Sequence, residues 1–307
     1  MKRTVCFLIA LLMAISMAAC GKAEKVNADD YLKDVPAVQN LKDTDTSKIL
    51  CLEDGVLTVG MDCNYAPYNW TQTKDRYGAV PISNVEDAYA NGYDVMIAKR
   101  ICETYGWKLE IVSCNRDTLA AAVQNKTVDV AIAGQLVTAD LMKEVNIAGP
   151  YYYATIVCLT AKDSRYANAK SIADLAGGKC TAQSGTIYYN ACLPQIQDAN
   201  IQIPAETTAE MLMQLENKTV DFVCTDMPTA MGMIAKNPNL TILNFSGTEG
   251  DFKFASEQER DENINVGISV LKGNGELTSL INKALSNLNE KHFNALMEYA
   301  IAIQLDN

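Results

Sequence analysis

The chain has 307 residues, with 37 acidic and 26 basic side chains and a formal net charge of −11. So acidic a chain is a poor nucleic-acid binder, because neutralising phosphates requires a basic face. Its single histidine, His292, argues against a Ser-His-Asp triad or a histidine-rich metal site. The length and the 49% apolar content allow about two globular domains.

Residues 1–19 are predicted to be a signal peptide. Lys2 and Arg3 precede an apolar run from Val5 to Met17, which is shorter than the ~20 residues that span a bilayer. The segment 18–21, Ala-Ala-Cys-Gly, resembles a bacterial lipoprotein signal, in which the cysteine is lipidated. Cys20 is therefore the predicted lipid attachment site, and the mature protein is predicted to be exported and membrane-anchored. The alternative is an ordinary signal peptide with an incidental cysteine.

Residues 20–48 are predicted to be a flexible tether. This segment is polar, with Asp29 and Asp30 and the run Asp43-Thr44-Asp45-Thr46-Ser47. Such a composition offers too little apolar surface to offset the entropy of ordering the chain.

Eight cysteines remain in the body, none in a Cys-x-x-Cys pair. This spacing argues against a zinc site and against a thioredoxin-type redox site. We expect most of these cysteines to be small buried hydrophobes. Export would also permit a disulfide, with no pairing indicated.

Helices and strands are predicted to alternate through the first half of the body. The expected elements are strand 56–60, helix 94–105, strand 108–112, a helix capped by Asp117, and strand 128–133. This alternation is typical of an α/β protein with a parallel sheet covered by helices.

A short repeat indicates two similar lobes. Asn-Lys-Thr-Val-Asp at 125–129 recurs at 217–221, 92 residues later, and each copy ends an apolar helix and opens an apolar strand. One more strand, 265–271, and helices within 277–303 complete the chain. Ligands of open α/β sheets lie beyond the carboxyl ends of the strands, so two facing lobes would form a cleft there.

From about Leu57 to Leu288 the chain resembles the family 3 extracellular substrate-binding proteins of polar-amino-acid ABC importers. The segments that carry the resemblance are 57–60 (LTVG), 65–68 (YAPY), 92–95 (GYDV), 97–98 (IA), 127–134 (TVDVAIAG), 149–152 (GPYY), 183–186 (QSGT) and 265–268 (NVGI).

The resemblance implies a two-lobed periplasmic-binding-protein type 2 fold, each lobe being a mostly parallel sheet flanked by helices. Lobe 1 would comprise residues 49–153 and 264–307, and lobe 2 residues 154–263. The lobes would close around a small ligand, an amino acid or related amine, and deliver it to an ABC permease outside the cytoplasm. Neither catalysis nor a cofactor or metal is implied.

The resemblance also implies the ligand-binding residues. Asp226 would bind the ligand's ammonium, and Tyr65 would cover its side chain with Asp62 on the same wall. Backbone N–H groups of Thr186 and Ile187, at a helix start, would reach its carboxylate. Further contacts are expected from the segment that ends the strand, at Gly134, Gln135, Leu136 and Thr138.

Three positions depart from the family pattern. Leu136 replaces a serine, Leu141 replaces the arginine that binds the ligand carboxylate, and Arg116 stands where a second aromatic residue is common. Leucine can replace none of arginine's bidentate bonding. Either the ligand lacks an α-carboxylate, or Arg116 supplies a new contact to it.

An aromatic group would suit a cationic ligand, although packing would explain its members as well. Its members are Tyr65, Tyr68, Trp70, Tyr188 and Tyr189. Two other functions remain open: a dehydratase-like enzyme on the same fold, and a sensory module that keeps the cleft without a transporter.

Overall fold

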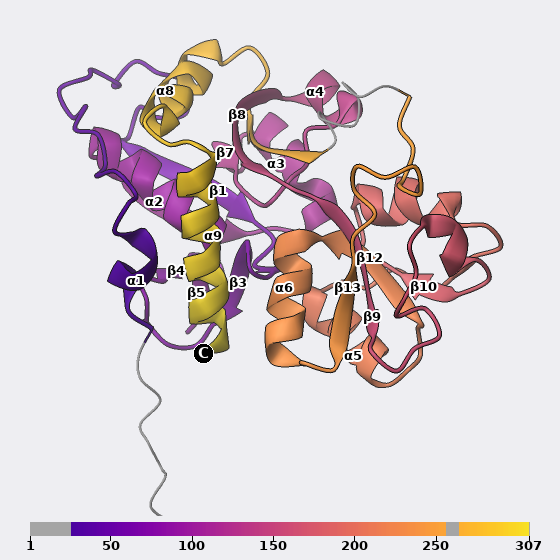
Figure 1. Ribbon diagram of the computed structural model, residues 1–307. Helices are drawn as coiled ribbons and strands as arrows, with labels where there is room; N and C mark the ends of the chain where they lie inside the picture. Colours follow the sequence, from indigo (N-terminus) through magenta and orange to yellow (C-terminus); the bar gives the residue numbers. More distant parts are fainter. Residues whose placement is uncertain (1–25, 256–263, 307) are drawn as a thin grey trace, which may run out of the picture.

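The computed structural model describes residues 26–255 and 264–306, apart from the side chain of residue 305, and forms two α/β lobes that lie side by side (Figure 1). The predicted signal peptide and Cys20 lie outside the described residues. Within the described ranges, every helix is too short or too polar to cross a membrane.

Lobe 1 is built on a five-stranded sheet in the order β6-β1-β7-β14-β8. The strands are β1 (Val56–Met61), β6 (Lys108–Ser113), β7 (Val130–Ala131), β8 (Asn146–Tyr153) and β14 (Asn265–Val270). β1 runs parallel to β6 and β7, whereas β14 runs antiparallel to β7 and β8. Four of the five strands therefore share one direction, as expected for a mostly parallel sheet.

Lobe 2 repeats this topology in the order β11-β10-β12-β9-β13. The strands are β9 (Ile156–Ala161), β10 (Lys179–Thr181), β11 (Asn200–Ile201), β12 (Phe222–Asp226) and β13 (Leu240–Leu243). In each lobe the antiparallel strand, β14 or β9, is the one that enters from the other lobe. The two crossing segments lie together, since the Ala154 N–H donates to the Ile264 carbonyl (2.8 Å).

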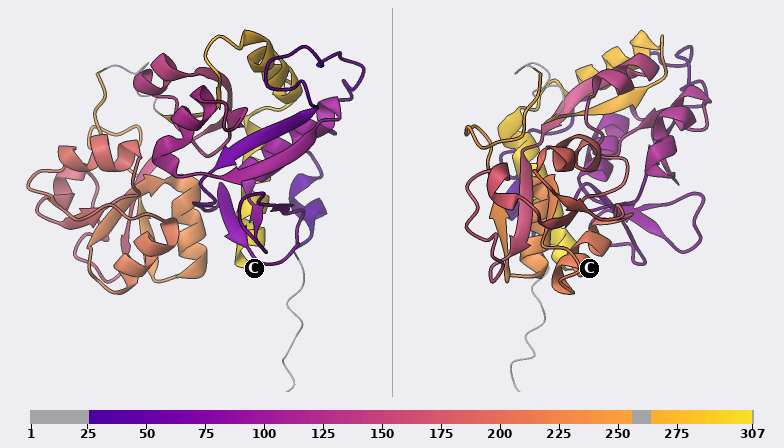
Figure 2. Two further views of the ribbon diagram at one scale, coloured as in Figure 1. Left: turned by 180° about the vertical axis from the view of Figure 1, so that it is seen from behind. Right: turned by 90° about the vertical axis from the view of Figure 1, so that its right-hand side faces the viewer.

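Helices cover both sheets, and α9 reaches from lobe 1 to α6 of lobe 2 (Figures 1 and 2). The helices are α1 (Ala28–Leu32), α2 (Tyr93–Tyr105), α3 (Leu119–Gln124), α4 (Ala139–Glu144), α5 (Thr208–Glu216), α6 (Met227–Lys236), α8 (Gly275–Leu285) and α9 (Glu290–Leu305). Short turns of helix lie at η1 (Arg116–Thr118), η2 (Ile172–Leu175), η3 (Tyr188–Cys192) and η4 (Leu193–Gln195). Asp117 lies inside η1, which Asn115 caps, so its predicted role as a helix N-cap is wrong.

The repeated pentapeptide occupies equivalent places in the two lobes. Asn125 ends α3 and Asn217 ends α5, and the lysine that follows each asparagine has a positive φ. Asp129 accepts from the Thr58 N–H (2.7 Å), and Asp221 accepts from the Lys179 N–H (2.9 Å). Each carboxylate thus bonds the backbone of the neighbouring strand, so the sequence repeat reflects a structural duplication.

A small antiparallel sheet stands beside the lobe 1 sheet, in the order β2-β3-β5-β4. Its strands are β2 (Asn64–Tyr65), β3 (Asn69–Gln72), β4 (Val80–Pro81) and β5 (Tyr89–Asn91). The turn of β2 and β3 carries Tyr65 and Tyr68 into the core, where their rings stack with centroids 5.0 Å apart.

The predicted flexible tether is wrong for residues 26–48, which pack on lobe 1. Leu32, Val35 and Leu41 lie against its core. Arg100 donates to the carbonyls of residues 36 and 37 (2.8 and 3.0 Å), and the Leu41 N–H donates to the Thr104 carbonyl (2.8 Å). The polar segment is ordered by partners that α2 supplies.

The eight body cysteines are free, and six of them are buried. Cys158 and Cys224 lie opposite each other on β9 and β12, inside the lobe 2 core. Burial raises the pKa of the Cys180 thiol to about 12. The interpretation of most cysteines as small buried hydrophobes agrees with this placement.

Candidate functional site

A cavity of about 260 Å³ lies between the lobes, beyond the ends of the central strands. Both lobes line it. The lining residues are Tyr65, Arg116, Asp117, Ala120, Gly134, Gln135, Leu136, Thr138 and Leu141 of lobe 1, with Gly185, Thr186, Ile187 and Tyr188 of lobe 2. Seven of the residues implied by the resemblance, and Arg116, are therefore brought together here.

Asp226 and Tyr65 bridge the lobes next to this cavity. The Tyr65 hydroxyl donates to Asp226 Oδ2, and Thr229 donates to the same carboxylate from its N–H (2.9 Å) and its hydroxyl (3.0 Å). Asp226 is fully buried as the N-cap of α6. Burial raises its pKa, whereas the bonds from Tyr65 and Thr229 lower it, so a cation brought beside it would favour the ionised form.

Gly134 lets the Tyr65 ring lie directly on the backbone. Its φ is +58°, and a Cβ there would come within 2.9 Å of Tyr65 Cε1 and 3.0 Å of Tyr68 Cγ. A larger residue would push both rings away from the cavity.

Arg116 enters the cavity from η1 and is held by four groups. Nη1 donates to Asp62 Oδ2 and to the Ala133 carbonyl (both 3.0 Å), and Nη2 donates to the Gly134 carbonyl (3.2 Å). Its Cζ lies 4.4 Å from the centroid of the Tyr65 ring. Burial is the largest influence and disfavours the charge, but Asp62 together with Tyr65 and Tyr188 outweighs it and raises the pKa of Arg116 above its usual range. The guanidinium is thus a permanent cation in the cleft.

Asp94 supports this wall from behind, a role that the sequence analysis did not assign. It is fully buried and accepts from the Tyr151 hydroxyl and from Asn69 Nδ2, both at 2.7 Å. The Tyr151 oxygen in turn accepts from the Gly134 N–H (3.0 Å). Burial raises the pKa of Asp94 to about 7. The motif at 92–95 contains this residue, but only the fold reveals its link to Gly134.

Lobe 2 presents backbone to the cavity at residues 185–187. The Thr186 hydroxyl donates to the Gln183 carbonyl (2.7 Å). Among the hydrogen bonds of the described residues, none uses the N–H groups of Gly185 or Thr186. The predicted helix start is a single π turn, η3. Gly185 and Thr186 thus line the cavity with backbone N–H groups that make no hydrogen bond among the described residues.

Leu141 lines the cavity on α4, so the cavity wall lacks the guanidinium that the family pattern places at this position. Thr138 caps α4 by accepting from the Leu141 N–H (3.2 Å). Gln135 accepts from the Ser269 hydroxyl (2.9 Å), and Leu136 pairs with Val266 of β14. This wall is apolar at Leu136 and Leu141, the two positions where leucine replaces a polar residue of the family pattern.

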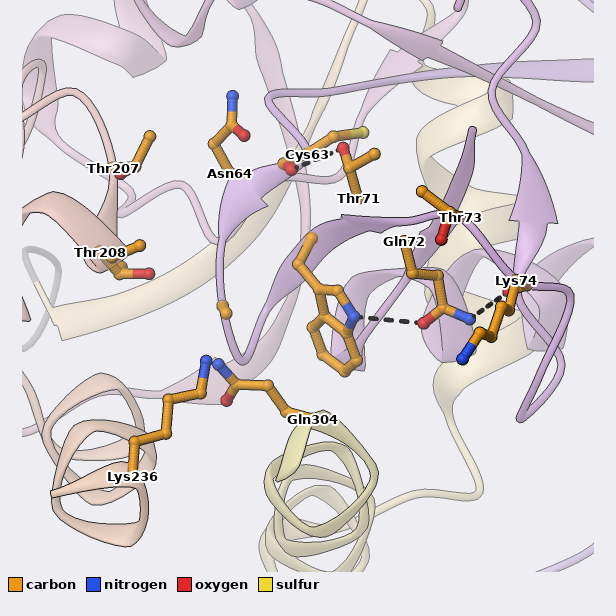
Figure 3. Close-up of a pocket in the computed structure, with 13 residues that line it drawn as sticks. Cys63, Asn64, Thr71, Gln72, Thr73, Lys74, Thr207, Thr208, Lys236 and Gln304 are labelled. Carbon is orange, nitrogen blue, oxygen red and sulfur yellow. Dashed lines mark hydrogen bonds between the residues drawn. The ribbon is translucent and has the colours of Figure 1, made fainter. Parts of the chain in front are cut away.

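Trp70, predicted as a ligand-binding residue, does not line this cavity but lies at another part of the boundary between the lobes. It lines a second pocket of about 500 Å³, together with Gln72 and Lys236 (Figure 3). Its Nε1 donates to Gln72 Oε1 (3.2 Å), and its ring packs with Tyr299 and Ile303 of α9. Trp70 follows Asn69, which faces the opposite side of β3 toward Asp94.

Other predicted aromatic residues are also separated. Tyr188 lines the cavity and Tyr68 lies behind Tyr65, whereas the Tyr189 hydroxyl donates to the Gln202 carbonyl (2.9 Å). The lining residues that the site prediction omitted are Asp117, Ala120, Leu141, Gly185 and Tyr188. Of these, Gly185 was signalled by the QSGT segment.

Comparison with known proteins identifies the fold and the family. The family model of the bacterial extracellular solute-binding proteins, family 3, matches residues 57–299. A probable histidine-binding protein of Campylobacter jejuni is 27% identical over 80% of this chain and 91% of its own length. The L-cystine-binding protein TcyA of Bacillus subtilis is 27% identical over 92% of both chains. A Streptococcus pneumoniae amino acid ABC transporter substrate-binding protein, solved with L-arginine, superposes with a TM-score of 0.67 at 25% identity, over 81% of this chain and 95% of that one.

Proposed function

The chain belongs to the bacterial extracellular solute-binding proteins of family 3, and we propose that it captures an amino acid between its lobes for the permease of an ABC importer. The observation that carries this proposal is the cavity of about 260 Å³ with walls from both lobes. Such a cavity forms only while the lobes are together, so ligand binding and lobe closure are coupled.

The polar groups around the cavity are arranged to hold an amino acid by its two ends. Asp226 and the Tyr65 hydroxyl would bind the ammonium group. The free N–H groups of residues 185 and 186 would bind the carboxylate from lobe 2. Arg116 would add a contact from lobe 1, because among the hydrogen bonds of the described residues none uses its Nε–H. This arrangement favours a ligand with a carboxylate over a simple amine.

The named relatives are binding proteins, which favours capture over the dehydratase-like reaction considered from the sequence. No observation favours a sensory module.

A thermal-shift screen of the twenty amino acids on residues 26–307 tests the proposal. A ligand that binds only the closed native state, at a hundred times its Kd, should stabilise it by about 2.7 kcal/mol. Small-angle scattering should show a more compact particle with that ligand than without it. If no amino acid shifts the transition and the scattering curves stay identical, the proposal is wrong.

We also propose that Cys20 is lipidated and anchors the exported protein. Replacing Cys20 with serine should move the protein from the membrane fraction to the soluble extracytoplasmic fraction, because serine cannot carry the thioether-linked lipid. Fractionation with immunoblotting would measure the change, and Cys51→Ser serves as a control that keeps the anchor. If the Cys20 variant stayed with the membrane, the attachment would lie elsewhere.

A further inference from the structure

The cleft contains a cation that belongs to the protein itself. The Arg116 guanidinium lies over the face of the Tyr65 ring, with Cζ 4.4 Å from its centroid, and pairs with Asp62 at 3.0 Å. The carbonyl oxygens of Ala133 and Gly134 accept the other hydrogen bonds that the Arg116 guanidinium donates. An aromatic face, a carboxylate and two carbonyls are the groups with which proteins bind a guanidinium or ammonium ligand.

We propose that Arg116 fills a cation subsite of the cleft, and so restricts the ligand to amino acids whose side chains carry no positive charge. This inference rests on the proposed function, in which the cleft binds an amino acid. It specifies the class of ligand and gives Arg116 the selecting role.

The position of Arg116 is fixed by groups of lobe 1, namely Asp62, the carbonyls of Ala133 and Gly134 and the face of Tyr65. Its side chain is 13% exposed and that of Asp62 is 6% exposed, so water screens their interaction weakly. A ligand side chain therefore meets the guanidinium rather than displacing it.

Charge then decides which side chains fit. The ligand's ammonium would be neutralised by Asp226, whereas a positively charged ligand side chain would lie beside Arg116, where repulsion between like charges is strong if little water is present. Without Arg116, the subsite would present the Tyr65 face, two carbonyls and Asp62, whose Oδ1 is already buried without a hydrogen-bond partner among the described residues. The empty subsite would thus attract the kind of cation that Arg116 now excludes.

The inference separates this chain from several of its relatives. One matched structure is bound to L-arginine, and one relative is named an arginine-binding extracellular protein. If Arg116 excludes cationic side chains, this chain does not share the ligands that those names state.

Calorimetry with L-arginine, L-lysine, L-glutamine and L-glutamate tests the inference on the parent and on Arg116→Ala. The parent should bind L-arginine and L-lysine at least tenfold more weakly than the better of the other two. Arg116→Ala should improve the affinity for L-arginine at least tenfold relative to L-glutamine, a ratio in which the loss of an Arg116 contact to the shared α-carboxylate cancels. Arg116→Met, which keeps most of the side-chain volume, should reject L-arginine less than the parent does if charge is decisive, and provides a second variant should the alanine variant misfold.

Arg165→Ala is the matched control. Arg165 also stacks on a tyrosine, with Cζ 4.6 Å from the Tyr166 centroid, but it lies in lobe 2 away from the cavity. This variant should bind all four amino acids as the parent does. Equal or tighter binding of L-arginine by the parent would overturn the inference and leave the proposed function intact. If the parent binds no amino acid, the proposed function fails, and the inference is then decided by whether the Arg116 variants gain L-arginine binding.

Discussion

Replacing Asp226 with asparagine is expected to weaken amino acid binding at least tenfold, which corresponds to about 1.4 kcal/mol. Asparagine is as good an N-cap as aspartate, so α6 should keep its bond from the Thr229 N–H. The substitution therefore removes the negative charge and leaves the local fold in place. Calorimetry with the best ligand from the amino acid screen would measure the loss.

Two further variants separate the role of the Asp226 charge from other effects. Asp221→Asn makes the same change in lobe 2, at a carboxylate that bonds the Lys179 N–H outside the cavity, and should leave Kd unchanged. Tyr65→Phe removes the hydroxyl that now donates to Asp226. If Asp226 binds the ammonium directly, Tyr65→Phe should be milder than Asp226→Asn, because the carboxylate stays available. Unchanged affinity in Asp226→Asn would refute the assignment.

Replacing Gly92 with alanine is expected to lower the free energy of unfolding by about 3 kcal/mol or more. Gly92 has a φ of +126°, and a Cβ there would collide with the Tyr68 carbonyl oxygen and lie 2.8 Å from the carbon of that carbonyl. This carbonyl cannot move away freely, because it accepts the Asp94 N–H at the start of α2 (2.8 Å). Urea denaturation would measure the loss in the transition that includes lobe 1.

Gly177→Ala is the control for backbone strain alone. Gly177 also has a positive φ, +68°, but no atom lies within 4 Å of the Cβ that alanine would add. Its expected loss is only that of a left-handed alanine, roughly 1–2 kcal/mol. Equal losses of unfolding free energy in the two variants would show that small movements relieve the collision at Gly92 and cost little free energy. Because Tyr68 stacks on Tyr65, Gly92→Ala should also weaken ligand binding.

The local sequence pattern was sufficient to predict several strands and helices and the duplication of the two lobes. β-branched runs and helical spacing predicted β1, α2 and β6, since apolar periodicity records which side of an element is buried. The repeated pentapeptide identified equivalent joints in the two lobes, because the same turn and the same aspartate-to-backbone bond are needed in each. The departures at Leu136, Leu141 and Arg116 were also visible in the sequence.

Only the tertiary structure decided where several of these residues act. Trp70 and Asn69 face opposite sides of one short strand, and the pattern alone did not say which side leads to the cleft. Residues 26–48 are too polar to predict as packed, yet Arg100 of α2 supplies donors that order them. Asp94 and Gly134 are linked through Tyr151, 57 residues from Asp94. Sequence by itself determined the two lobes and the unusual chemistry of the cleft wall, whereas the partners of each polar group depended on which distant segments the packing brought together.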